Sequence, residues 1–152
     1  MNKRSIILFL ATGAYSGYIP FAPGTWGSLV TIPLCLALSF FAWYTQLFII
    51  LLFLPIAAWI SGEAEVYLGQ KDPGAIVIDE IAGMLITLAF VPFTFVNAII
   101  GFLLFRIFDI FKPYPISKAE TYFKNGTGIL MDDVIAGVFA HVILEILIYI
   151  IN

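Results

Sequence analysis

Paired carboxylates stand out in a chain that is otherwise strongly apolar. Asp79 and Glu80 are adjacent and lie between isoleucines, and Asp132 and Asp133 form a second adjacent pair. Burying an ionised carboxylate is costly unless it is paired or coordinates a metal. Oxygen ligands without histidine or cysteine suit Mg²⁺ or Ca²⁺ rather than zinc. We therefore interpret these four side chains as Mg²⁺ ligands. The alternatives are that Asp79 and Glu80 reach water at an interface, and that Asp132 or Asp133 is a charge favoured at a helix start.

A row of charged residues follows in the string Arg106-Ile-Phe-Asp109-Ile-Phe-Lys112. Arg106 and Asp109 are three residues apart, so they share one face of a helix and can interact. A guanidinium offers a planar fork to phosphate oxygens, and an ammonium offers a point charge. Arg106 and Lys112 are therefore candidate phosphate ligands, unless Arg106 and Asp109 only neutralise each other. The candidate catalytic carboxylates are Asp79, Glu80, Asp109 and Asp133.

Glycines and small hydroxyl residues fill the segment Pro23-Gly-Thr-Trp-Gly-Ser, directly before an apolar run. At a helix N-terminus, such residues leave backbone N–H groups free to meet an anion. The alternative is a turn followed by a helix cap. The candidate phosphate-binding residues of this segment are Gly24, Thr25, Gly27 and Ser28.

The composition indicates a membrane protein. Of 152 residues, 62% are hydrophobic and 11% are charged, whereas a soluble domain is about half apolar and a quarter charged. The length fits one domain, so residues 1–152 are expected to form a single integral-membrane domain. The net charge of −3 and the lack of a basic stripe in the sequence argue against a nucleic-acid partner. The sequence leaves the oligomeric state open.

Five apolar stretches predict an all-α membrane protein, a compact bundle of about five transmembrane helices. They cover residues 29–43, 47–60, 81–92, 96–108 and 134–151. Several need their flanks to reach the roughly 20 residues of a spanning helix. Asp is a common N-cap residue and Pro is common at the first position of a helix, so Asp72 and Pro73 predict a third helix over residues 73–91. Residues 5–14 are too few to cross, so they predict an N-terminal interfacial or re-entrant helix.

Charged residues gather on one side of this predicted bundle. The links at residues 44–46 and 92–94 carry no charge, whereas the opposite links hold Lys71, Arg106, Lys112, Lys118 and Lys124. By the positive-inside rule, the charged side is cytoplasmic. His141 and Glu145 lie far from that side. They fit an interhelical polar contact, a fragment of a proton relay or a pair of unknown purpose at lipid depth, and we favour a structural role. Cys35, the single cysteine, is expected to be a buried and inert side chain.

Four strings of this sequence resemble motifs of the phosphatidylglycerophosphatase A family, in the same order and spacing. They are Pro23-Gly-Thr-Trp-Gly-Ser-Leu, Asp72-Pro-Gly-Ala-Ile-Val-Ile-Asp-Glu-Ile-Ala-Gly, Phe105-Arg-Ile-Phe-Asp-Ile-Phe-Lys-Pro-Tyr-Pro-Ile and Gly128-Ile-Leu-Met-Asp-Asp-Val-Ile-Ala-Gly. The resemblance covers the chain from about Gly13 to Gly137. It implies Mg²⁺-dependent hydrolysis of the terminal phosphomonoester of phosphatidylglycerophosphate, giving phosphatidylglycerol and phosphate. It also implies a bacterial inner membrane and an active site that faces the cytoplasm.

Two nucleophiles are compatible with these residues. Water activated by the metal, with a carboxylate as base, is the first, and Asp109 forming an aspartyl-phosphate is the second. Positioning and charge neutralisation dominate phosphoryl transfer, so Arg106, Lys112 and the backbone of residues 24–28 are expected to bind the phosphoryl oxygens. The rival class is a small cation-coupled transporter or channel that uses the same acids. Such a protein would place ionisable groups near the membrane midplane.

Overall fold

Helices make up the regular secondary structure of the described part of the chain. The structure is a computed structural model that describes residues 2–71, 73–114, 116–117 and 126–151. Its elements are α1 (Lys3–Ala11), the short 3-10 helix η1 (Ser16–Tyr18), α2 (Pro23–Ser39), α3 (Trp43–Leu68), α4 (Ile78–Thr87), α5 (Phe95–Phe111) and α7 (Gly126–Ile151). The predicted all-α class is therefore confirmed for these residues.

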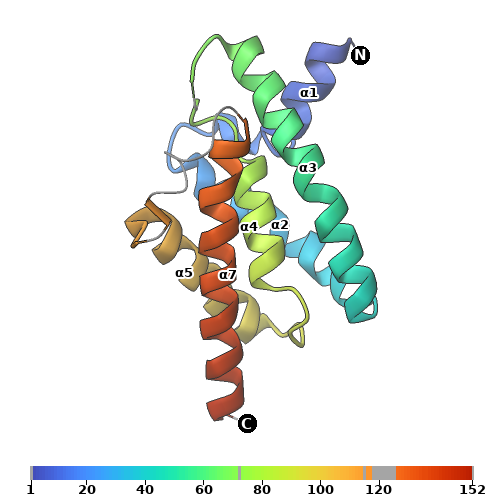
Figure 1. The fold of residues 1–152 in the computed structure, drawn as a ribbon, viewed down its shortest axis with the longest axis vertical. Helices are drawn as coiled ribbons and strands as arrows, with labels where there is room; N and C mark the ends of the chain where they lie inside the picture. The colour runs from blue at the N-terminus through green and yellow to red at the C-terminus, as the bar shows by residue number, and fades with distance from the viewer. Residues whose placement is uncertain (1, 72, 115, 118–125, 152) are drawn as a thin grey trace.

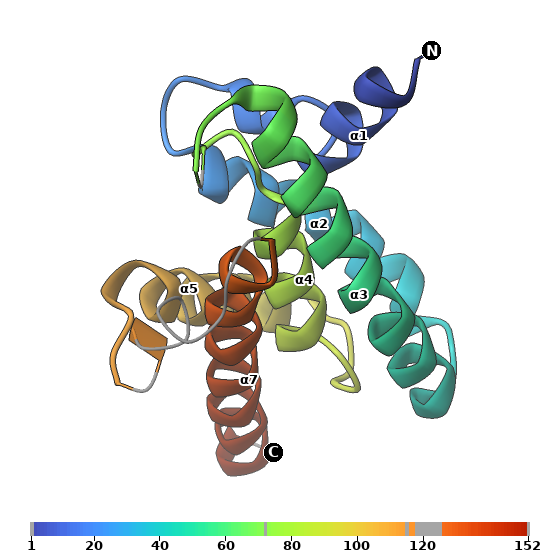
Figure 2. The same ribbon diagram turned by 45° about the horizontal axis from the view of Figure 1, so that its top comes forward.

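The helices run up and down along the long axis of the molecule (Figure 1). In this view α2, α4 and α7 descend, whereas α3 and α5 ascend. The short helix α4 lies between α3 and α7 in both ribbon views (Figures 1 and 2) and packs on each of them. Most of α4 is buried, namely Ile78, Asp79, Ile81, Ala82, Gly83, Met84, Leu85 and Thr87. It is thus the central helix, and the carboxylates in its first turn lie inside the protein.

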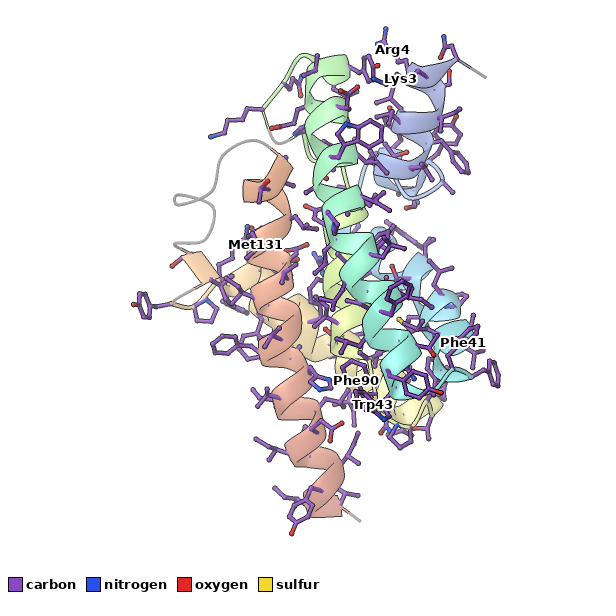
Figure 3. The ribbon with its side chains drawn as sticks, turned by 45° about the vertical axis from the view of Figure 1, so that its right-hand side comes forward. Lys3, Arg4, Phe41, Trp43, Phe90 and Met131 are labelled. Atoms are coloured by element: carbon purple, nitrogen blue, oxygen red, sulfur yellow. The ribbon has the colours of Figure 1, made fainter. Side chains whose placement is uncertain are left out.

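Two of the described helices are long and apolar enough to cross a membrane: Trp43–Leu68 and Thr127–Ile151. Both expose large apolar side chains, such as Phe48 and Trp59 on the first and Val142 and Tyr149 on the second. Helices that are apolar all round are typical of membrane spans or of large cores. In Figure 3, Lys3 and Arg4 lie at one end of the molecule, while Phe41, Trp43 and Phe90 lie toward the other. The remaining helices are shorter, with 17 residues in α2 and in α5, ten in α4 and nine in α1.

The prediction of a helix over residues 73–91 is wrong at both ends. Residues 73–77 form a turn, in which Ile76 N–H donates to Pro73 O at 2.9 Å and Val77 N–H donates to Ala11 O at 2.8 Å. These donors are used outside a helix, so α4 begins only at Ile78. At the other end Phe90 has φ of 64°, and its N–H donates to Gln46 Oε1 at 2.9 Å. Asp72, the predicted N-cap, lies outside the described residues.

The segment after α1 is packed closely against this turn. Gly17 lies so near the turn that a Cβ added to it would meet Ala75 O at 2.1 Å. Contact between two backbones at this distance requires glycine. The N-terminal region is thereby attached to the residues that lead into α4, and it takes part in placing the first turn of that helix.

Candidate active site

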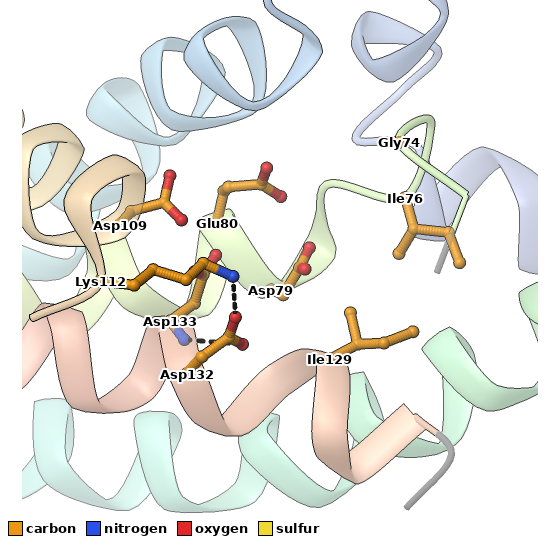
Figure 4. A pocket seen from close by; sticks show the side chains of 9 residues that line it. All are labelled: Gly74, Ile76, Asp79, Glu80, Asp109, Lys112, Ile129, Asp132 and Asp133. Atoms are coloured by element: carbon orange, nitrogen blue, oxygen red, sulfur yellow. Dashed lines mark hydrogen bonds and ion pairs between the residues drawn. The ribbon is translucent and has the colours of Figure 1, made fainter. Parts of the chain in front are cut away.

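Most of the predicted charged residues line a single cavity of about 190 Å³. It lies where the first turn of α4, the end of α5 and the first turns of α7 meet (Figure 4). The lining comprises Asp79, Glu80, Asp109, Lys112, Asp132 and Asp133, together with Gly74, Ile76 and Ile129. Three elements that are far apart in sequence therefore bring their acids to one place. The lining isoleucines carry no sequence signal that distinguishes them from other apolar residues.

Three carboxylates form a group that fits a metal ion. Asp79, Glu80 and Asp133 each offer one oxygen, and these atoms lie within 4.8 Å of one another. Asp79 is only 8% exposed, and among the described residues neither Asp79 Oδ1 nor Glu80 Oε2 has a hydrogen-bond partner. Buried carboxylates of like charge repel each other and lack solvation. A cation between them would offset the repulsion and replace the lost solvation. The donors are hard oxygens, which suit Mg²⁺, Ca²⁺ or Mn²⁺.

Helix α7 approaches α4 closely enough to complete this group. A Cβ added to Gly137 would meet Gly83 O at 2.4 Å, and one added to Gly83 would meet Asp133 O at 2.7 Å. Glycine at both positions permits this close approach of the two backbones. Because no side chain separates the helices here, Asp133 comes within reach of Asp79 and Glu80.

Asp132 differs from its neighbour in the contacts it makes. Its Oδ2 accepts a hydrogen bond from Lys112 Nζ, and its Oδ1 accepts from the backbone N–H of Asp133 at 3.1 Å. Both residues lie past the first turn of α7, which contains no acidic side chain. Their position is therefore not explained by a favourable charge at the helix start. Asp132 lines the cavity but stands outside the group of three carboxylates.

Lys112 lies just beyond α5 as its C-cap, in the left-handed conformation with φ of 41°. Its N–H donates to Phe108 O, which ends the helix and turns the side chain toward α7. Burial alone lowers the pKa of Lys112, but the hydrogen bond and charge of Asp132 outweigh it and hold that pKa above its ordinary range. Lys112 therefore remains a cation and can meet the oxygens of an anion in the cavity.

Arg106 extends the site toward α2. Its Nη1 lies 2.5 Å from Asp109 Oδ2, which confirms the predicted ion pair. Its Nε is buried and has no hydrogen-bond acceptor within the part of the chain that is described. Gly24 lies beside it, because a Cβ added there would be 2.2 Å from Glu80 Oε1 and 3.0 Å from Arg106 Nη1. The start of α2 thus abuts both Glu80 and Arg106.

The other residues of the α2 segment are engaged in local packing. Ser28 is fully buried, and its hydroxyl donates to Gly24 O at 2.8 Å. A Cβ on Gly27 would meet the Cβ of Val77 at 2.6 Å. Thr25 N–H donates to Ala22 O at 2.9 Å. Of the four predicted phosphate-binding residues, the structure thus places Gly24 against the charged groups of the site.

Enzymes of phosphoryl transfer place groups that bind a metal cation beside groups that bind the phosphate anion. The class that the fold and this site define is thus an all-helical protein with a buried group of carboxylates next to a lysine and an arginine. A family model described as Phosphatidylglycerophosphatase A matches residues 9–148. The chain belongs to the phosphatidylglycerophosphatase A family, as its four motifs suggested, and it is a phosphatase.

Three relatives show how far the similarity extends. A phosphatidylglycerophosphatase A from Escherichia coli is 38% identical, over 86% of this chain and 77% of the relative. One of the same name from Haemophilus influenzae is 38% identical, over 90% and 85%. A Bacteroides thetaiotaomicron protein, provisionally named a phosphatidylinositol-3-phosphatase, is 38% identical over 96% of each chain. No solved structure matches the chain.

Proposed function

We propose that this protein hydrolyses the terminal phosphomonoester of phosphatidylglycerophosphate, releasing phosphatidylglycerol and phosphate. The observation that carries the proposal is the cavity itself, where three clustered carboxylates face Lys112 and lie next to Arg106. The names of the relatives from E. coli and H. influenzae support this choice of substrate. A lipid substrate also agrees with the apolar surfaces of the two long helices.

Mg²⁺ is the proposed cofactor, and Asp79, Glu80 and Asp133 are the residues that would hold it. Such an ion, when bound, supplies charge stabilisation to the phosphoryl oxygens and lowers the pKa of a water. Asp132 remains a candidate further ligand, because it lines the same cavity and is held there by Lys112. Mg²⁺ usually takes only one or two carboxylates together with substrate phosphate, so these acids leave room for a separate base.

The cationic side chains are proposed to bind the phosphoryl group. Arg106 has a buried Nε that lacks an acceptor among the described residues, and Lys112 points into the cavity. The first turn of α2, at Gly24, would complete the binding of the oxygens with Thr25, Gly27 and Ser28 supporting its shape. Asp109 is proposed to hold Arg106 in place through their ion pair and to accept a proton. Positioning and charge neutralisation are what phosphoryl transfer chiefly requires.

We further propose that the protein is integral to the bacterial inner membrane, with five crossings and the site on the cytoplasmic side. The crossings would be α2, α3, α4, α5 and α7, each short helix being lengthened by its flanks, and α1 would lie at the interface. Exposed aromatic side chains occur near both ends of the molecule, as is typical of membrane interfaces. They include Tyr15, Tyr18, Phe21 and Trp26 around η1 and the start of α2, and Phe40, Trp43, Tyr44 and Phe95 at the end of α2 and the starts of α3 and α5.

The decisive experiment measures phosphate release in detergent micelles with and without Mg²⁺. Wild type is compared with Asp79→Asn and with Glu145→Gln, a matched control that neutralises an exposed carboxylate of α7 away from the cavity. We expect metal-dependent release from phosphatidylglycerophosphate that Asp79→Asn abolishes and Glu145→Gln retains. Phosphatidylinositol 3-phosphate is assayed in parallel, and a clear preference for it would refute the proposed substrate. No release with any metal from folded protein would favour the transporter or channel instead.

The nucleophile is tested separately by rapid quenching with substrate labelled in the terminal phosphate. A water nucleophile, which we propose, predicts that no label stays on the protein. Labelled protein that disappears in Asp109→Asn would establish an aspartyl-phosphate instead. Full unfolding before counting separates covalent label from phosphate that is only trapped.

A further inference from the structure

Helices α4 and α7 face each other through three matched pairs of residues. On α4 the series is Asp79, Gly83 and Thr87, and on α7 it is Asp133, Gly137 and His141. Members of each series are four residues apart, so each series forms one stripe along its helix. The first pair supplies carboxylates to the site, and the second is the close glycine contact. The third pair lies two turns from the cavity, and neither the proposed reaction nor the family motifs assign it a role.

Thr87 connects the two helices at the level of the glycines. It is fully buried, and its Oγ1 donates to Gly83 O at 2.8 Å and lies 3.4 Å from Gly137 O. The hydroxyl therefore sits between the carbonyls of the two glycines that touch. A carbonyl on each helix is attracted to the same proton, which favours one relative height of α4 and α7.

His141 extends the same connection by one more turn. Its Nδ1 lies 3.3 Å from Thr87 O, and its ring meets the ring of Phe90 edge to face at 6.0 Å. Thr87 lies near the end of α4, where backbone carbonyls have no intrahelical partner. An N–H at Nδ1 would satisfy this carbonyl and attach the end of α4 to α7. The predicted interhelical contact of His141 is confirmed in this form.

We propose that Thr87 and His141 are positioning residues that set the register of α4 against α7 and thereby the spacing of Asp79 and Asp133. The inference rests on the proposed function only in treating these carboxylates as metal ligands. A helix rises 1.5 Å per residue, so even a small slip between the helices changes the distance between carboxylates by a comparable amount. Metal sites demand tight ligand geometry, and residues that orient ligands contribute strongly to affinity.

A merely structural role for Thr87 would be shared by Thr31, which serves as the matched control. Thr31 is also fully buried, and its Oγ1 likewise donates to a glycine carbonyl four residues earlier, Gly27 O at 2.8 Å. It lies on α2, however, and it takes no part in the contact between α4 and α7. Replacing either threonine by valine keeps the side-chain shape and removes the hydroxyl, which at Thr31 contacts one carbonyl and at Thr87 contacts two.

The test measures binding of Mn²⁺ by electron paramagnetic resonance on the full protein in detergent, without substrate. We expect Thr87→Val to weaken Mn²⁺ binding roughly 10-fold or more, and Thr87→Ser, which keeps the hydroxyl, to restore most of it. Thr31→Val is expected to bind Mn²⁺ as wild type does, even where its melting temperature falls as far as that of Thr87→Val. The Mg²⁺ concentration for half-maximal phosphate release should rise in parallel for Thr87→Val.

A second pair of variants keeps the inference testable if Thr87→Val does not fold. His141→Asn retains a nitrogen near the position of Nδ1 and should keep Mn²⁺ binding, whereas His141→Phe should weaken it. Equal Mn²⁺ affinity in Thr87→Val and wild type, equal weakening by Thr31→Val, or failure of wild type to bind Mn²⁺ would each overturn the inference. Mn²⁺ binding that depends on Thr87, in a protein that releases no phosphate from any lipid, would support it while refuting the proposed function.

Discussion

Lys112, at the end of α5, donates a hydrogen bond to Asp132 of α7 and so joins two helices through residues that are 20 positions apart in the sequence. The pair forms one wall of the cavity (Figure 4). Asp133, the next residue, instead belongs to the group of carboxylates with Asp79 and Glu80. Adjacent aspartates thus divide between an ion pair and a candidate metal site.

Replacing Lys112 by methionine should lower stability, because Asp132 is buried and would lose its charged donor. We expect a loss of about 1–2 kcal/mol in the free energy of unfolding, since Lys112 itself remains partly exposed to solvent. Unfolding in detergent, measured for Lys112→Met, Asp132→Asn and the double variant, checks this through their coupling energy. Additive effects of the two substitutions would show that the pair contributes nothing to stability.

The stability that this pair contributes should not change between about pH 7 and pH 9. The pKa of Lys112 is raised in the folded protein, chiefly by Asp132 acting against burial. A raised pKa gives stability that is fully present below the unfolded pKa, about 10.4 for lysine, and that is lost as pH rises through the folded pKa. The difference in unfolding free energy between wild type and Lys112→Met should therefore be constant over this range. A difference that declines steadily from pH 7 would contradict the assigned pKa direction.

Gly24→Ala should impair activity more than stability. The added Cβ would meet Glu80 Oε1 at 2.2 Å, and the end of a glutamate side chain can move aside. Stability should stay within about 1 kcal/mol of wild type, because alanine also favours the helix. Activity should fall at least roughly 10-fold, since misplacing a reacting group by about 1 Å can cost far more.

Gly27→Ala provides the contrast for this measurement. Its Cβ would meet Val77 Cβ at 2.6 Å, close to a backbone that cannot swing away. Overpacking of this kind costs about 1–3 kcal/mol. Equal losses of activity per unit of lost stability in both variants would argue against a special role of Gly24.

Asp79→Asn should stabilise the metal-free protein while it abolishes activity. Asp79 is buried beside Glu80, and its Oδ1 has no partner in the described residues. Removing one charge relieves repulsion that only a cation would otherwise offset. We expect a higher melting temperature without metal, no further rise on adding Mg²⁺, and a rate at least roughly 100-fold lower. A melting temperature below that of wild type without metal would mean that Asp79 has a stabilising partner.

Labelling with a membrane-impermeant maleimide tests the proposed topology. Cys35 is buried and should not react in intact cells, so added cysteines can be placed in the natural background. Lys71→Cys should react only after the cytoplasmic side is opened, and Tyr44→Cys should react from outside. Both positions are exposed. Labelling of both cysteines from the same side of the membrane would therefore show that α3 does not cross it.

Much of the chemistry of this protein is determined by its sequence alone. The apolar composition indicates a membrane protein, and carboxylates between isoleucines indicate a site, because charges in such surroundings need a partner. The acids that were singled out line one cavity together with Lys112, and Arg106 lies beside Gly24 next to it. The prediction of a helix over residues 73–91 was wrong for two reasons. The turn at residues 73–77 is held by a hydrogen bond to Ala11, and the N–H of Phe90 donates to Gln46.

Only the tertiary structure decided which acid joins the candidate metal site and which forms an ion pair. Successive residues of a helix point about 100° apart, and here Asp133 joins Asp79 and Glu80 whereas Asp132 pairs with Lys112. Which of them meets Asp79 depends on how α7 is rotated against α4, and that rotation is set by the contact of Gly83 with Gly137. The same contact places Thr87 beside His141, a relationship across 54 residues. Contacts between distant segments depend on packing of the whole chain, which local sequence patterns do not encode.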